Sequence, residues 1–242
     1  MLTYSQRDRF VLSIESMKPA YHDISINHFM RWLFASLRNV LSRIYRHHVA
    51  VLYELNLNRS DIMPENSDTM PRGYNLRLAT LDDLPACAAM AGMKVNEYLR
   101  RAKHGDACYI TVFENKPVNQ SWVRFGSAYI RGIGYYLDNG TGVAYLYNIY
   151  SHPVHRRRGL YKTALQHLHQ MLTHRGITRL RQIVDNTNAI PLAVLPDFGY
   201  KMARRIVHTR VCGLKITVIR DPSGKILSRK IFISPPENVF QI

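Results

Sequence analysis

The chain has 242 residues, of which 46% are hydrophobic and 21% are charged. This composition is typical of a folded soluble protein and excludes a disordered one. The apolar runs are short and interrupted by Arg or Lys, so no membrane-spanning helix of roughly 20 residues is expected. The net charge of +16 indicates an anionic partner, surface or cofactor, without saying which.

The N-terminal residues MLTYSQRDRF lack the apolar core of a secretory signal, so a cytoplasmic protein is expected. Cys87, Cys108 and Cys212 are odd in number and show no zinc-like spacing. We therefore expect free, buried thiols in a reducing compartment, and no metal site.

Residues 1–73 differ in character from the rest and are predicted to form an N-terminal extension and linker. Ser25 to His48 is predicted to be a basic amphipathic helix, because apolar side chains recur every three or four residues. Val49–Tyr53 is predicted to be a strand, and 57–73 a loop. Three interpretations of the helix stay open: packing on its own domain, peripheral contact with an anionic membrane, and association through its apolar stripe with a partner or with a second copy in a homodimer.

From Tyr74 to Arg220 the pattern alternates between strands and helices, which predicts one domain with a mixed sheet. Thr80 and Asp83 have the spacing of a capping box at the start of a helix. Strands are predicted at 75–79, 108–113, 121–131, 143–150, 177–184 and twice within 202–220. A helix is predicted after Thr80, with Leu84, Cys87, Ala88 and Met90 on it or at its end, and further helices at 160–175 and from Asn188 to near Phe198-Gly199. A turn at 221–224 leads into a last strand in a C-terminal segment, 221–242.

The most informative stretch is the junction between the hydrophobic strand that stops at His152-Pro153 and the helix that begins at Leu160. The first turn of a helix presents backbone N–H groups without intrahelical partners, and the helix dipole adds partial positive charge. Gly159 lets the backbone approach an anion closely. The basic side chains Arg156, Arg157, Arg158 and Lys162 raise the local potential. The junction therefore predicts a phosphate or pyrophosphate site; a solvated helix start is the structural alternative.

This junction resembles the acyl-CoA signature of the GNAT superfamily of N-acyltransferases, over about residues 75–220. The resemblance implies a GNAT-like mixed, largely antiparallel sheet with helices on both faces. It implies that acetyl-CoA, or another acyl-CoA, is the donor. The pantetheine arm would pair with the backbone of Ile149, Tyr150 and Ser151, and the pyrophosphate would be held at Arg156, Arg157, Arg158, Gly159, Leu160, Tyr161 and Lys162. Asn188, which opens a later helix, would lie near the thiol.

Two positions depart from the family pattern. Tyr161 stands where a small residue is usual, so either the loop opens slightly or the ring points away. Leu195 stands where many family members carry the tyrosine that protonates the departing thiolate, and Pro196 follows it. Either the thiolate leaves unassisted, or Tyr147, Tyr150 or Tyr200 replaces the missing donor.

An acceptor amine needs a base to remove its proton. Asp185, at the end of a strand, is the first candidate, with loop capping as its structural alternative. Tyr147 and His152 are further candidates that could act through water. Trp122 and Tyr129 are expected to line the acceptor site, although strand aromatics usually belong to the core.

We therefore expect an N-acyltransferase that moves an acyl group, most simply acetyl, to a small primary amine in a ternary complex. No cysteine has a nucleophile arrangement, so no acyl-enzyme is expected. The resemblance to GNAT proteins in which a basic helix precedes the domain implies an amino sugar at the inner face of a membrane as one candidate acceptor. The alternative is a weakened GNAT-fold binding module for an anionic membrane or nucleic acid, but no nucleic-acid motif is present.

Overall fold

The computed structural model describes Arg31 and residues 45–57, 70–212 and 214–232. The chain divides into two compact units, 1–45 and 46–242, and the fold below is that of the second. Most of the helix expected between Ser25 and His48 lies outside the described residues. Its predicted end is wrong, because Tyr45–His48 already form the start of a strand. This segment is extended because it is part of β1, which is hydrogen-bonded between β9 and β8 in the sheet.

A nine-stranded sheet organises the unit, in the order β11-β10-β9-β1-β8-β7-β4-β3-β2. Its strands are β1 (Tyr45–Asn56), β2 (Tyr74–Leu78), β3 (Ala107–Phe113), β4 (Lys116–Arg124), β7 (Val143–Ser151), β8 (Arg179–Asp185), β9 (Lys201–Val211), β10 (Leu214–Arg220) and β11 (Ile226–Phe232). β7 and β8 pair in parallel, whereas the pairs β2–β3, β3–β4, β4–β7, β1–β8, β9–β10 and β10–β11 are antiparallel. The prediction of a mixed, largely antiparallel sheet is confirmed.

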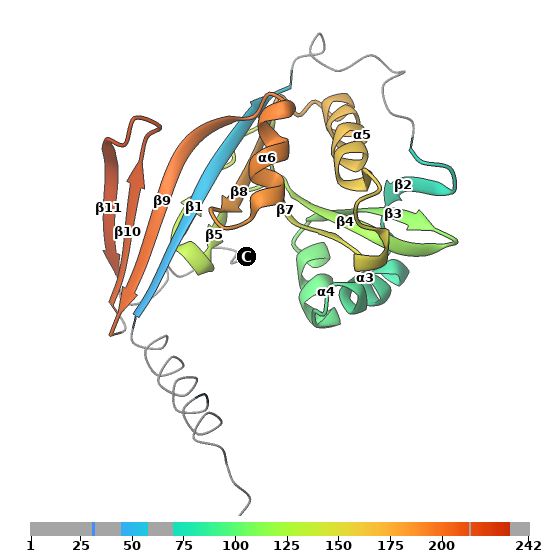
Figure 1. The fold of residues 1–242 in the computed structure, drawn as a ribbon, viewed down its shortest axis with the longest axis horizontal. Coiled ribbons are helices and arrows are strands. Elements are labelled where there is room, and N and C mark those ends of the chain that lie inside the picture. The colour runs from blue at the N-terminus through green and yellow to red at the C-terminus, as the bar shows by residue number, and fades with distance from the viewer. Residues whose placement is uncertain (1–30, 32–44, 58–69, 213, 233–242) are drawn as a thin grey trace, which may run out of the picture. The chain divides into compact units, whose positions relative to one another are not determined.

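Helices cover both faces of the sheet (Figure 1). On one face, α3 (Leu84–Met90) and α4 (Val95–Lys103) pack on a core that includes Trp122 and Tyr147. We call this the α4 face. On the other, α5 (Leu160–His174) and α6 (Ala189–Asp197) pack on a core that includes Leu146 and Leu180. Alternation along each strand sends successive side chains to opposite faces, so both faces are apolar where helices cover them.

Strand β1 lies inside this sheet, between β8 and β9, although the sequence placed it in the N-terminal extension. It pairs with β8 from Ala50↔Asp185 to Asn56↔Arg179. Ala50 and Leu52 contribute to the α4-face core. The neighbours of β8 are set by long-range backbone pairing, which local patterns do not encode.

Two further predictions need correction. The single strand expected from Ser121 to Arg131 is two strands, because the extended conformation is interrupted around Gly126. The first strand, β4, ends at Arg124. The second, β5 (Ala128–Ile130), pairs with β6 (Tyr135–Leu137) in a separate two-stranded sheet. The Asn139 amide donates to the Gly126 carbonyl and holds this break in place. Helix α4 was not expected, since its exposed face is strongly charged.

The capping box at Thr80 is confirmed: its backbone N–H and its hydroxyl both donate to the Asp83 carboxylate, at 2.7 and 2.9 Å. The cysteines are free; Cys87 and Cys108 are buried, but Cys212 is exposed at the turn after β9, where its φ is +48°. In the described part of the chain, no helix is long and apolar enough to cross a bilayer.

Candidate functional site

Strands β7 and β8 separate after a short parallel contact. The last recorded pair is Leu146↔Gln182, yet β7 continues to Ser151 and β8 to Asp185. Beyond that pair, the edge of β7 that faces β8 has no recorded strand partner among the described residues. An edge of free N–H and C=O groups accepts an extended ligand as an added strand. The predicted pantetheine contacts at residues 149–151 lie on this edge.

A β-bulge lies on β7 just past the point of separation. Trp122 pairs with Tyr147 and Gln120 with Tyr150, so two steps along β4 match three along β7. Asn148 occupies the bulge with φ +47°, and its side-chain amide donates to the Tyr98 hydroxyl at 3.3 Å. A bulge re-aims backbone groups and bends the strand. Its position therefore supplies the change of direction between the paired and free parts of β7.

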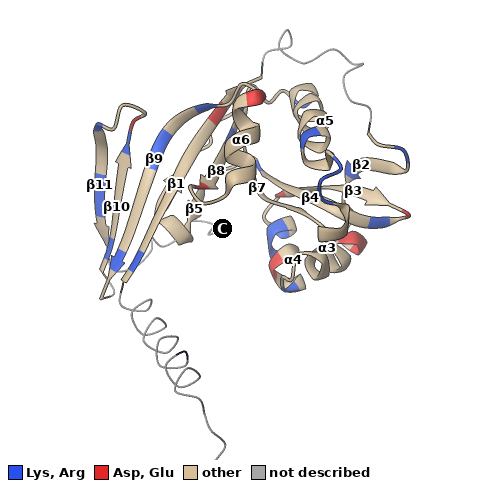
Figure 2. Ribbon diagram, viewed as in Figure 1, with Lys and Arg blue, Asp and Glu red and all other residues tan. Residues whose placement is uncertain are grey.

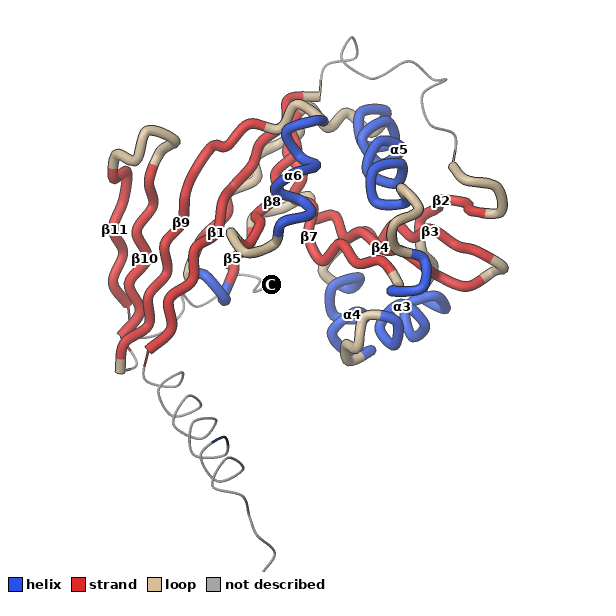
Figure 3. Tube along the Cα trace, viewed as in Figure 1, coloured by secondary structure: helices blue, strands red, loops and turns tan. Residues whose placement is uncertain are grey.

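The chain then turns through a short 3-10 helix, Pro153–His155, into α5 (Figure 3). Gly159 is the N-cap of α5, with φ +75°, and open space surrounds the position that a Cβ would take. The first intrahelical bond runs from the Thr163 N–H to the Gly159 carbonyl at 3.1 Å. The backbone N–H groups of residues 160–162 are consequently directed out of the helix start, toward the region where an anion would bind.

Arg156, Arg157 and Arg158 are consecutive exposed residues in this loop, whose ribbon is blue in Figure 2. Arg156 donates to the Ser151 carbonyl at 3.1 Å and lies over the Tyr150 ring, 5.6 Å from its centroid. Arg158 donates to the Tyr74 hydroxyl at 3.1 Å. Two of the three arginines are therefore held by neighbouring strands.

Arg157 itself has φ +61°, so left-handed backbone occurs at two positions separated by one residue. Lys162 reaches Asp197 of α6 at 3.2 Å, but both side chains are more than half exposed, so the pair contributes little to stability. The ring of Tyr161 packs against the core on the α5 side, and burial raises the pKa of its hydroxyl to about 12. Of the two alternatives considered for Tyr161, an opened loop or a ring that points away from it, the structure has the second.

Helix α6 begins where the sequence predicted it. Asn188 is its N-cap, is exposed, and makes no capping hydrogen bond through its side chain. Its side-chain amide is therefore accessible to solvent at the start of α6. Leu195, by contrast, is completely buried in the core under α5 and α6.

The three tyrosines considered as proton donors lie in different surroundings. Tyr200 is buried; it contacts His169 Nε2 at 3.0 Å and accepts a hydrogen bond from Gln182 at 3.1 Å. Burial raises its pKa, which makes the phenol a still weaker acid. Tyr150 is partly exposed on the free part of β7. Of these tyrosines, Tyr150 alone combines exposure with a place on that edge.

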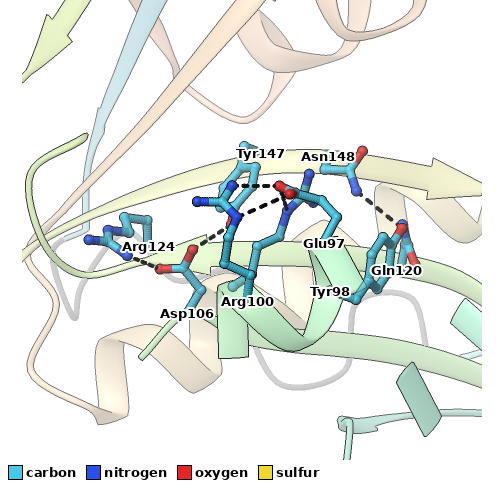
Figure 4. A network of polar contacts seen from close by, with 9 residues as sticks. Glu97, Tyr98, Arg100, Asp106, Gln120, Arg124, Tyr147 and Asn148 are labelled. Atoms are coloured by element: carbon cyan, nitrogen blue, oxygen red, sulfur yellow. Dashed lines mark hydrogen bonds and ion pairs between the residues drawn. The ribbon is translucent and has the colours of Figure 1, made fainter. Parts of the chain in front are cut away.

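A buried polar network lies on the α4 face beside the bulge (Figure 4). Tyr147 donates to Asp106 Oδ2 at 2.5 Å, and Arg124 donates to Oδ1 at 2.8 Å. Burial raises the pKa of Asp106, although Tyr147 and Arg124 act to lower it. Burial, followed by the charge of Asp106, raises the pKa of Tyr147. The predicted role of Tyr147 as a base stays a prediction, and its proton is already directed to Asp106.

Arg101 fills an aromatic cage next to this network. Its guanidinium carbon is 5.3 Å from the Tyr98 ring centroid, 5.4 Å from that of Trp122 and 5.2 Å from that of Tyr147. It is 6% exposed and pairs with Glu97 at 3.2 Å. Cation–π contacts of a desolvated guanidinium stabilise such an arrangement by up to about 2 kcal/mol. The cage fixes α4 against the sheet.

The two predicted acceptor residues do not lie in one sheet. Trp122 is fully buried on the α4 face, within the cage. Tyr129 is buried in the separate β5–β6 sheet. His152 follows β7 directly; its backbone N–H donates to the Val118 carbonyl at 2.8 Å.

Asp185 lies at the tip of β8, three residues beyond the last pair with β7. Its Oδ1 accepts from the Thr187 N–H at 2.8 Å and from the Thr187 hydroxyl at 2.5 Å, and its Oδ2 contacts His48 Nε2. Burial raises the pKa of Asp185, but the bonds from Thr187 and the neighbouring His48 outweigh it, so the pKa is lowered. The carboxylate therefore caps the loop, as its structural alternative predicted, and also contacts an imidazole.

Sequence reasoning missed four of the residues that shape this region: Asp106, Arg101, Arg124 and His48. None belongs to a motif. Asp106 follows Gly105 in a polar turn, and Arg101 lies on a charged helix, which are both patterns of ordinary surface residues. Their burial follows from the packing of α4 on the sheet.

Comparison with known proteins identifies the class. Residues 80–199 match the family described as the acetyltransferase (GNAT) family. The chain belongs to the GNAT superfamily, and it contains a GNAT acetyltransferase domain. None of the curated proteins compared with this chain matches it.

Solved structures share the fold at low sequence identity. A GCN5-related N-acetyltransferase from Sphaerobacter thermophilus is 14% identical, with a TM-score of 0.51 over 73% of this chain and 56% of that one. A tandem GNAT protein from the clavulanic acid biosynthesis pathway is 17% identical, with a TM-score of 0.51 over 72% of this chain and 56% of that one. The chain thus spans little more than half of either structure.

Proposed function

We propose that this protein is an N-acyltransferase that transfers an acyl group, most simply acetyl, from CoA to a primary amine by direct attack. One observation carries the proposal. The free edge of β7 beyond Leu146 leads, through a bulge and a left-handed Gly159, straight to the positive start of α5. An extended arm that ends in a pyrophosphate is the ligand chemistry that this succession of groups suits.

The residues present fit an acyl-CoA. In this proposal, the backbone of residues 149–151 holds the pantetheine arm, and the N–H groups of 160–162 hold the pyrophosphate beside Arg157. The exposed Asn188 amide orients the thiol end. The thioester supplies the activated acyl carbon, and the chain positions the amine against it.

The acceptor would approach from the α4 face. Tyr147 and the bulge residue Asn148 lie on one arm of the separated strands, and Asp185 lies on the other. The Tyr98 hydroxyl accepts hydrogen bonds from the Gln120 amide, at 2.5 Å, and from the Asn148 amide. These two bonds restrain the separated part of β7. Attack of the amine nitrogen forms a C–N bond while the C–S bond breaks and CoA departs.

The test combines binding and turnover with the full-length protein. Acetyl-CoA should raise the melting temperature at micromolar concentration. Free CoA should appear when glucosamine, spermidine or a peptide with a free amino terminus is added. A protein that binds acetyl-CoA but releases no CoA with any amine would contradict the transferase, whereas absence of both would also exclude an acyl-CoA site.

A further inference from the structure

A histidine from β1 and an aspartate from β8 meet beside the separated strands. His48 Nε2 is in ion-pair contact with Asp185 Oδ2. Ala50 pairs directly with Asp185, and His48 is two residues earlier, on the same face of β1. Because Ala50 and Leu52 belong to the α4-face core, His48 and Asp185 both lie on the face from which the acceptor would approach.

Asp185 is held so firmly that it suits orientation better than proton uptake. Its Oδ1 is occupied by two donors of Thr187, and its Oδ2 by His48. A carboxylate stabilised in its ionised form is a weak base. An acceptor-only carboxylate next to an imidazole keeps the proton on the nitrogen that faces it, here Nε2. The other ring nitrogen, Nδ1, is then the basic one.

The pair is accessible, unlike His208 on the same sheet and His169 on α5. The side chains of His48 and Asp185 are 38% and 39% exposed. His208, on the neighbouring β9, is 6% exposed and contacts the Thr217 hydroxyl at 2.9 Å. His169 is buried against Tyr200.

The charged surroundings of His48 come from three strands. Asp185 on β8 contributes negative charge, and Arg46 precedes His48 on the same face of β1. His208 on β9 is close enough for its pKa to be lowered by burial and then by the positive charge of His48. Of these three groups, only Asp185 carries a charge opposite to that of an imidazolium.

The distance along the strand agrees with a role at the acyl group. Asp185 is three residues past Gln182, or about 10 Å beyond the point of separation at a rise of about 3.3 Å per residue. On the facing arm, the bulge at Asn148 lies two residues past Leu146. An acyl group that lay between the separated parts of β7 and β8 would therefore have the Asn148 bulge on one side and the His48–Asp185 pair on the other.

We infer that His48 is the base that takes the proton of the acceptor amine, and that Asp185 positions its imidazole. This inference rests on the proposed N-acyltransferase activity. The amine nitrogen bonds to the acyl carbon, its proton passes to His48 Nδ1, and the C–S bonding pair leaves with CoA as thiolate. The imidazolium then returns its proton to the thiolate or to solvent. His48 lies outside residues 80–199, which match the family.

The experiment compares three full-length variants with the unaltered protein. His48→Gln retains a donor toward Asp185 but has no base. Asp185→Asn keeps the imidazole but loses the orienting charge. His47→Gln is the matched control, because His47 is the adjacent strand residue, faces the other side and contacts the Thr209 hydroxyl at 3.1 Å. Acetyl-CoA affinity, kcat and KM for the best amine, and the pH profile of kcat/KM are measured for each.

His48→Gln should lower kcat about 10²- to 10⁴-fold with unchanged acetyl-CoA affinity, and should remove the limb of the pH profile that reports the imidazole. Asp185→Asn should lower kcat with unchanged KM and unchanged acetyl-CoA affinity, because the imidazole loses the carboxylate that orients it. His47→Gln should stay within about twofold of the unaltered protein. A His48→Gln variant that keeps its rate and pH profile would contradict the base role of His48 and leave the proposed acyltransferase activity standing. An unaltered protein that releases no CoA with any amine would contradict both the acyltransferase activity and the role of His48.

Discussion

The Tyr147 phenol donates a 2.5 Å hydrogen bond to the carboxylate of Asp106, whose side chain is fully buried. This bond connects β7 to the turn before β3. Tyr147 is the residue at which β7 separates from β8. Arg124 completes the triad from β4. The edge along which we propose that an acyl-CoA binds is thus anchored by a buried charge, which couples the stability of this region to pH.

Tyr147→Phe should lower the free energy of unfolding by about 1–3 kcal/mol, because the buried Asp106 carboxylate loses a donor. The pH dependence gives a second signature. Since burial raises the pKa of Asp106, the folded protein binds a proton more tightly than the unfolded chain, and stability falls as pH rises through this range. Loss of the phenol raises that pKa further, so the deficit in urea denaturation should be larger at pH 7 than at pH 4.

Tyr53→Phe is the matched control for this variant. Tyr53 lies on β1, is partly buried and packs on the α5 side. Its loss of one hydroxyl should change stability by less than about 0.5 kcal/mol. Equal effects at Tyr53 and Tyr147, or a deficit at Tyr147 that does not change with pH, would contradict the coupling to Asp106.

Gly159→Glu should weaken acetyl-CoA binding at least tenfold, about 1.4 kcal/mol, because a carboxylate would occupy the start of α5. Gly176→Glu provides the control for backbone strain. Gly176 ends the same helix with φ +80°, and open space surrounds its Cβ position too. Both variants should lose about 1–2 kcal/mol of stability, but only the first should lose the ligand in a calorimetric titration. Equal losses of affinity would show that strain, not the anion site, is responsible.

His169→Gln should flatten the acid side of the stability curve. Burial lowers the pKa of His169 to about 3. The unfolded chain, with an ordinary value near 6.5, therefore binds more protons between pH 6.5 and pH 3, and stability falls as pH falls through that window. The slope from this one group approaches about 1.4 kcal/mol per pH unit. Chemical denaturation at several pH values from 7 to 4 measures this slope of the free energy of unfolding. His174→Gln, on the exposed last turn of α5, is the control and should not change the slope.

Leu195→Tyr should destabilise the protein and leave CoA release no faster. The family position for a donor tyrosine is here fully buried beneath α5 and α6. A larger, polar side chain would overpack this core at a cost of about 1–3 kcal/mol. Leu195→Met, which nearly conserves volume, should cost less than about 1.5 kcal/mol. A faster and equally stable Leu195→Tyr variant would instead indicate that the position faces the thiol.

Local sequence determined the strand–turn–helix junction at Gly159 and the elements around it. The geometry of this junction follows from its own residues, which are a strand, a basic turn, Gly159 and an apolar helix face. Glycine tolerates positive φ, and a helix start presents free N–H groups regardless of distant contacts. The same holds for Asn188 at the start of α6 and for the capping box at Thr80. These features need only neighbouring residues.

Only the tertiary structure decided which distant groups meet. Backbone pairing inserted β1 beside β8 and so placed His48 against Asp185, although 137 positions separate them (185 minus 48). Packing of α4 on the sheet buried Arg101 and Asp106, and packing of α6 buried Leu195. Strand order and helix packing depend on which surfaces exclude water together, and the local pattern of a chain does not encode that choice.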